Sequence, residues 1–166
     1  MRSFKNTLSI LGLIACQVCG YAVEQSESPS NVIRGMASEE IINKSQNFNE
    51  INPDLYQFKL NLPQETIYEL VGEKDNLAWS LAVADIKQIV PHFHRHTLET
   101  YTVVAGILEV TINNENSVLR AGDVVTIPIN AIHTARSLSE GPARILVSCL
   151  PAWTEEDHII AETIQP

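Results

Sequence analysis

From residue 55 onward the chain consists of short stretches rich in valine, isoleucine, leucine and threonine, separated by turn signals. Stretches of this length and composition are typical of β-strands, and Gly, Pro, Asn and Asp mark the turns between them. The predicted strands are residues 55–62, 66–71, 77–84, 86–94, 99–105, 107–112, 117–120, 124–127, 133–138 and 144–150. Short strands at this spacing predict an all-β antiparallel sandwich or barrel.

The chain before residue 55 has a different character. Residues 23–30 are polar and read as a linker, and residues 38–44 predict a short helix with Ser38 as its N-cap. A length of 166 residues accommodates one domain, and no internal repeat is present. We therefore expect a linker and N-terminal arm over residues 23–54, the barrel over residues 55–150 and a C-terminal tail over residues 151–166.

Residues 1–22 have the pattern of an export signal. Arg2 and Lys5 supply positive charge, residues 8–15 form an apolar core, and Gly20-Tyr21-Ala22 resembles a cleavage site. The apolar run is too short to span a bilayer. We therefore expect the mature chain to work outside the cytoplasm, in the periplasm or secreted.

A second interpretation of the same segment stays open. Leu13-Ile14-Ala15-Cys16 resembles a bacterial lipobox, in which Cys16 would be acylated and become the first mature residue. The protein would then be a membrane-anchored lipoprotein facing the periplasm, attached only through lipidated Cys16. Cys149 lies in an apolar run and is expected to be a buried small hydrophobic residue.

The charge of the chain bears on its partners. Asp+Glu number 20 against 11 Lys+Arg, which gives a formal net charge of -9. Nucleic-acid binding needs clustered Lys and Arg, and no such cluster is present in the sequence. We therefore expect a small-molecule partner and no nucleic acid.

Four histidines and a glutamate lie close together in the sequence or in the predicted sheet. His92 and His94 are two residues apart, so in a strand both rings would point to one side. Glu99 follows in the next strand, and His133 begins a later one. Imidazole and carboxylate together suit one divalent transition metal ion, whether iron, manganese, nickel, copper or zinc. His96 offers an alternative register, His94-His96-Glu99, and is otherwise expected at the pocket rim.

The segment that contains His92, His94 and Glu99 and the segment that leads to His133 resemble the paired motifs of the cupin superfamily. The first motif there is His-x-His, three or four residues, Glu, six residues and Gly, and its matches here are His92, His94, Glu99 and Gly106. The second is Gly, five residues, Pro-x-Gly, two residues, His, three residues and Asn, and its matches are Gly122, Pro128 and His133.

The chain departs from these motifs at three positions. Ile86 stands where a leading Gly is usual, Asn130 replaces the turn Gly, and Ser137 replaces the terminal Asn. Asn130 is a mild change, because Asn tolerates the left-handed backbone conformation better than other non-Gly residues. None of the three is a metal ligand in the family. The resemblance covers residues 55–150 and implies the ligand set His92, His94, Glu99 and His133.

The resemblance implies a fold and an association state as well. We expect a double-stranded β-helix, the jelly-roll barrel of the cupins, with a short N-terminal helical segment. Cupins are commonly dimeric, so a homodimer is expected, in which residues 31–53 could supply an exchanged arm.

The leading functional hypothesis is an exported mononuclear metalloenzyme, a dioxygenase-like oxidoreductase acting on a small oxygen-rich organic substrate. Glu99 is a candidate ligand or base, while Tyr101 and Arg136 are candidates to hold the substrate, and Arg136 fits a surface strand position equally well. Two alternatives stay open: a metal-dependent sugar isomerase or lyase, and a non-catalytic barrel that binds a small molecule such as a sugar. Trp153 is expected either to close the barrel mouth or to pack on its rim, and His158 is expected at the surface.

Overall fold

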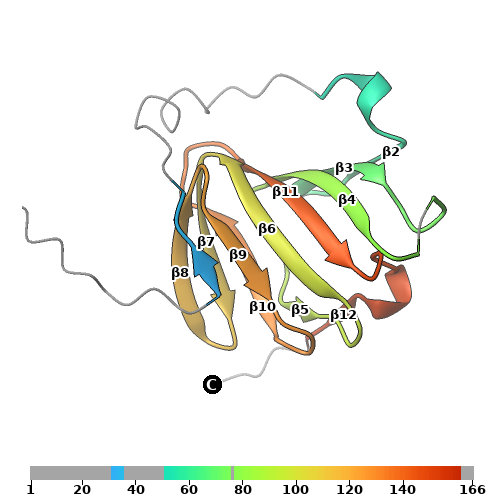
Figure 1. The fold of residues 1–166 in the computed structure, drawn as a ribbon. Helices are drawn as coiled ribbons and strands as arrows, with labels where there is room; N and C mark the ends of the chain where they lie inside the picture. Colours follow the sequence, from blue (N-terminus) through green and yellow to red (C-terminus); the bar gives the residue numbers. More distant parts are fainter. Residues whose placement is uncertain (1–30, 36–50, 76, 162–166) are drawn as a thin grey trace, which may run out of the picture.

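The structure is a computed structural model that describes residues 31–35, 51–75 and 77–161. Its strands form two antiparallel sheets that face each other (Figure 1). In spatial order the longer sheet contains β1 (Val32–Ile33), β9 (Val124–Ile127), β6 (Leu98–Ala105), β11 (Ala143–Leu150), β4 (Ser80–Ile86), β3 (Glu65–Val71) and β2 (Phe58–Asn61). The shorter sheet contains β12 (Ile159–Ile160), β5 (His92–Phe93), β10 (His133–Ser137), β7 (Ile107–Ile112) and β8 (Glu115–Arg120).

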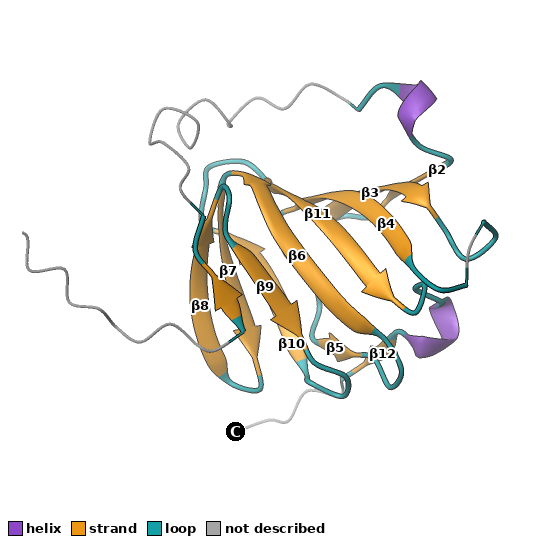
Figure 2. Ribbon diagram, in the orientation of Figure 1, coloured by secondary structure: helices purple, strands orange, loops and turns teal. Residues whose placement is uncertain are grey.

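Helical structure in the described residues is limited to two 3-10 turns, η1 (Pro53–Leu55) and η2 (Glu155–Asp157) (Figure 2). The all-β double-sheet fold predicted from the sequence is therefore confirmed. The predicted helix at residues 38–44 and the export signal at residues 1–22 lie outside the described residues. Within the described part of the chain, no helix combines the length and apolarity that crossing a membrane requires.

The strand prediction over residues 86–94 was wrong. Ile86 ends β4, and the next strand is only the two residues of β5. Between them the chain is irregular: the Ile89 N–H donates to the Ala135 carbonyl, and Pro91 has no N–H to give to a ladder. His94 consequently lies in the loop after β5, not on the same strand as His92.

The first predicted strand was too long at its start, because η1 occupies residues 53–55 and β2 begins at Phe58. The strand predicted at residues 117–120 begins earlier, at Glu115. The cause is the tight turn at Asn113 and Asn114, which have φ angles of 48° and 72°. Two successive left-handed residues make the hairpin turn that best matches the twist of paired strands, and Asn suits that conformation.

The core lies between the two sheets and follows the alternation of the strands. On β6, Glu99, Tyr101, Val103 and Ala105 are buried, because side chains two residues apart point to the same face of a strand. The other fully buried aliphatic side chains include Ile86, Leu108, Val110, Leu119, Ile127 and Ile145. Each such side chain contributes about 1.5–3 kcal/mol by leaving water. Cys149 is buried, as expected, and its Sγ lies 3.8 Å from Glu99 Oε1.

Two tight turns hold the strands that carry the site. Gly106 joins β6 to β7 with a φ of +85°, and a Cβ there would lie 3.1 Å from the Ala143 Cα. Asn130, in the turn between β9 and β10, has a φ of 64°. Its N–H donates to the His94 carbonyl at 2.7 Å. The residue that replaces the family's turn glycine therefore adopts the left-handed conformation that the sequence predicts for it.

Candidate metal centre

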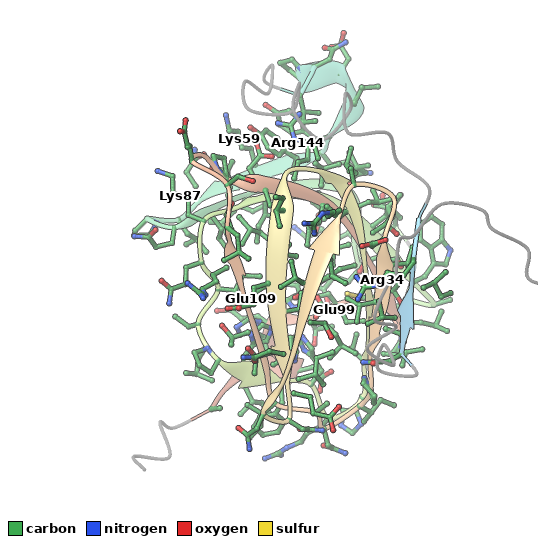
Figure 3. All side chains as sticks on the ribbon, turned by 90° about the vertical axis from the view of Figure 1, so that its left-hand side faces the viewer. Arg34, Lys59, Lys87, Glu99, Glu109 and Arg144 are labelled. Atoms are coloured by element: carbon green, nitrogen blue, oxygen red, sulfur yellow. The ribbon has the colours of Figure 1, made fainter. Side chains whose placement is uncertain are left out.

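The four predicted ligands come from both sheets and meet inside the barrel. His92 lies on β5, His94 in the loop that follows, Glu99 near the start of β6 and His133 at the start of β10. His92 and His133 are direct partners across the β5–β10 pair. All four side chains are buried, and one possible ligand atom from each lies within 4.8 Å of the others. Figure 3 shows Glu99 in the interior, among the strands.

Hydrogen bonds fix the orientation of all three imidazole rings. The Nδ1 atoms of His92 and His133 lie 2.9 Å from the carbonyls of Val90 and Ala131, each two residues earlier in the chain. The Nδ1 atom of His94 lies 3.0 Å from the Asp157 carbonyl. Because a carbonyl can only accept, each Nδ1 carries the proton and donates it. In the neutral rings each Nε2 is therefore an unprotonated nitrogen with a lone pair for a metal.

The nitrogen and oxygen atoms that face one another in this cluster all carry lone pairs, so they need a cation between them. The Nε2 of His133 lies 3.0 Å from Glu99 Oε2, and the Nε2 of His94 lies 3.7 Å from the same oxygen. The Nε2 of His94 is buried and, in the described structure, has no hydrogen-bond partner. Neutral rings and an ionised carboxylate present only lone pairs to one another, and a bound divalent ion satisfies them together. Three nitrogens and one oxygen fit a first-row transition metal.

The surroundings favour the ligand form of His92 and of Glu99. Burial, followed by the neighbouring His133, lowers the pKa of His92 to about 3, so its ring is neutral near pH 7. Burial raises the pKa of Glu99, but the neighbouring His133 and His94 rings outweigh it and lower that pKa, so the carboxylate is ionised. Burial and the Glu99 charge raise the pKa of Tyr101, which keeps the phenol protonated.

Asp157 supports the site from the far end of the chain. Its carboxylate accepts hydrogen bonds from the backbone N–H groups of Arg95, His96 and Thr97 at 2.9 to 3.2 Å. Its carbonyl accepts the His94 Nδ1 proton. One residue therefore fixes both the loop that carries His94 and the ring itself. Sequence reasoning missed Asp157, because no local pattern links it to a loop about 60 residues earlier.

His158 lies deeper than the surface position expected from the sequence. It is half-buried, and its ring stacks on His92 with centroids 4.2 Å apart and an angle of 14° between the planes. Trp153 lies edge-on to His158 at 6.0 Å. Both residues line a cavity beside the cluster, so the expectation of a surface position for His158 was wrong.

A cavity of about 750 Å³ opens beside the cluster on the inner face of the longer sheet. His92 and Glu99 line it, and so does Tyr101. Arg136 does not. It is exposed on β10, where its Nε donates to Glu109 Oε2 at 2.5 Å, so the structure places it apart from the other candidate residues. His96 is also exposed and lies outside the four-residue cluster.

Comparison with known proteins agrees with this architecture. Residues 82–149 match the family model described as "Cupin domain". An uncharacterized protein of Methanocaldococcus jannaschii is 29% identical over 91 residues, which are 55% of this chain and 72% of that protein.

Solved structures show the same fold at low identity. PAC13 of Streptomyces with uridine, described in another structure as a nucleoside dehydratase, has a TM-score of 0.58 and 16% identity over 72% of this chain and 95% of its own. An oxalate decarboxylase of Lactobacillus farciminis has a TM-score of 0.53 and 22% identity, over 61% of this chain and 32% of its own. These neighbours are enzymes, and at such identity they establish the fold alone.

Proposed function

The chain belongs to the cupin family, and from that premise we propose that it is a mononuclear metalloenzyme of the dioxygenase type acting on a small organic substrate. One observation supports the proposal above the others. Three imidazole nitrogens and the Glu99 carboxylate converge at the wall of a cavity of about 750 Å³. Cavities of about 300 to 1,000 Å³ are the usual size for small ligands.

The arrangement leaves room for substrate next to the ligands. His92 and Glu99 line the cavity, whereas His94 and His133 are not part of its wall. Four protein ligands leave up to two positions of an octahedral ion, and a bound iron, manganese or copper ion there would supply Lewis-acid or redox chemistry toward a substrate oxygen and dioxygen. Tyr101 lines the same cavity, and its protonated phenol interacts with the Glu99 carboxylate.

A second candidate is a metal-dependent isomerase or lyase, and His158 favours it. This imidazole lies in the cavity wall beside His92 and is not one of the four ligands. A reaction that moves a proton within the substrate needs such a group outside the ligand set.

Oxygen consumption separates the candidates. The protein loaded with iron, manganese, copper, nickel or zinc would be incubated with enediols, catechol-like diols and hydroxy acids in an oxygen electrode. We expect substrate-dependent oxygen uptake with iron, and none after His94→Ala. Turnover without oxygen in the zinc or nickel protein would favour the isomerase or lyase. Tight binding without turnover under any of these conditions would contradict an enzymatic role.

We also propose that the protein is exported and works as a homodimer. The export proposal is supported by the charged start and apolar core of residues 1–22, and the dimer by the family resemblance. Mass spectrometry of the mature N-terminus would distinguish cleavage after Ala22 from an acylated Cys16, and an unprocessed Met1 would contradict export. Light scattering of the mature protein tests the dimer, and a monomeric mass would contradict it.

A further inference from the structure

The charged side chains of the cavity wall are all of one sign. Among the described residues that line it, Glu65, Glu69, Glu99 and Glu155 are acidic, and no Lys or Arg is present. The two lining histidines, His92 and His158, have pKa values lowered first by burial. Most of the remaining wall is aliphatic, from β2, β3, β4 and β11.

Lys59 and Arg144 lie on strands that line the cavity, but neither residue is part of its wall. In Figure 3, Lys59, Lys87 and Arg144 lie toward one end of the molecule, away from Glu99. Lys59 lies over the Tyr68 ring, and Arg144 makes two hydrogen bonds to Asp85 at 2.6 and 2.7 Å. Proteins recognise carboxylates and phosphates mainly through Arg and Lys. The cavity therefore lacks the groups that an anionic substrate would need.

A bound metal does not reverse this balance. An ion of charge +2 held by the ionised Glu99 retains one positive charge. Glu65, Glu69 and Glu155 remain in the wall to oppose it. A negatively charged molecule would therefore lose hydration on entry without gaining a matching cation beyond the metal itself.

Glu65 is a partly buried acidic residue of the cavity wall. It begins β3, and it shares with Ile67 and Glu69 the strand face that lines the cavity. It lines the same cavity as Glu99, and burial first and the charge of Glu99 second raise its pKa. Within the described part of the chain, no group donates a hydrogen bond to its carboxylate. A ligand that carries a donor would satisfy it.

We propose that the cavity accepts a small, largely apolar molecule without negative charge, and that Glu65 selects it by accepting a hydrogen bond from its hydroxyl or amino group. This inference rests on the proposed function in taking the cavity as the substrate site. Glu65 is thereby a specificity-determining residue, and we expect the cavity to reject phosphate esters and organic acids, including the hydroxy acids of the oxygen-uptake panel.

The test uses three probes that share one skeleton and differ in charge: cyclohexanol, cyclohexylamine and cyclohexanecarboxylate. Their Kd values for the zinc-loaded protein are measured by ligand-observed NMR at pH 7.5. We expect the alcohol and the amine to bind and the carboxylate to bind at least about tenfold more weakly. Glu65→Gln should weaken the amine roughly tenfold and strengthen the carboxylate. Glu140→Gln, the same change at an exposed position outside the cavity, should alter none of the three.

Metal content and melting temperature are measured on the same samples. Full metal loading of Glu65→Gln shows that the variant is folded with an intact centre. The inference is overturned if the carboxylate binds as tightly as the other probes, if neither the alcohol nor the amine binds, or if Glu65→Gln leaves the Kd ratios unchanged. Failure to load metal at all would instead contradict the proposed function, while the charge preference could still be measured on the metal-free barrel.

Discussion

Each ligand histidine is oriented by a backbone carbonyl, but the carbonyls differ in origin. His92 and His133 use the residue two positions earlier, Val90 and Ala131, so their orientation is set by local chain geometry. His94 uses the carbonyl of Asp157, 63 residues later. Backbone carbonyls hold the three rings, so a metal ion does not have to order them. His94 is the ligand whose position depends on distant structure.

Asn130 provides a residue-level test of the turn that positions His133. Its φ of 64° is unfavourable for a residue with a Cβ, and Asn tolerates it better than Ala. Asn130→Ala is expected to destabilise the metal-free protein by about 1 kcal/mol, whereas Asn130→Gly should change stability by only a few tenths. Urea denaturation measures both. Equal stability of Asn130→Ala and wild type would contradict a strained turn.

At the level of elements, the metal centre joins the two sheets. Glu99 comes from the longer sheet, and His92 and His133 come from the shorter one. The C-terminal segment completes the shorter sheet, because β12 pairs with β5 through Ile159 and Phe93. Together with η2 it brings Asp157 against the His94 loop. The segment from Glu155 to Ile160 is therefore a structural part of the site.

Removing the Asp157 carboxylate should loosen the His94 loop. Asp157→Asn keeps the carbonyl that orients the ring but weakens the three bonds to the loop N–H groups. We expect the metal Kd to rise roughly 10- to 100-fold, as it does when outer-shell partners of metal ligands are lost. Chelator competition measures it. Glu156→Gln is the matched control, because Glu156 is exposed in the same 3-10 turn and should change nothing.

The four ligands could be predicted from the sequence, but the residues that orient and surround them could not. Spacing along the chain identifies the ligands, because His92, His94 and Glu99 lie in the first motif and His133 lies in the second. Asp157 and His158 belong to the C-terminal segment and reach the site only through the folded structure. A single sequence contains no pattern that predicts such long-range contacts. Arg136 was a candidate because β10 starts with His133. Three residues further along, the strand turns that side chain to the outer face, where it pairs with Glu109.

The strand prediction at residues 86–94 shows a related limit. Apolar β-branched residues favour a strand there, but the backbone N–H groups of Lys87 and Gln88 both bond to the Gln64 carbonyl, outside any ladder. Tertiary contacts override the local preference in this segment. The inner face of β6 was predictable, because alternation along a single strand already separates Glu99 and Tyr101 from their neighbours.

For the whole molecule, metal binding should couple to folding. The cluster brings one carboxylate and three imidazoles together only in the folded chain, so metal stabilises the native state by mass action. At a free metal concentration about 100 times the Kd, the gain is about 2.7 kcal/mol. That gain corresponds to a rise in Tm of roughly 5 to 15 °C for a domain of this size. Differential scanning calorimetry with and without a chelator measures it, and His133→Ala should show no rise.

The central claim is that His92, His94, Glu99 and His133 hold one metal ion, and elemental analysis tests it most directly. The protein would be purified without chelators or a histidine-rich tag, beside His94→Ala and the exposed-site control His96→Ala. We predict about one transition metal ion per chain in wild type and in His96→Ala, and almost none in His94→Ala. Equal metal content in wild type and His94→Ala, or loss of metal in His96→Ala alone, would contradict the account.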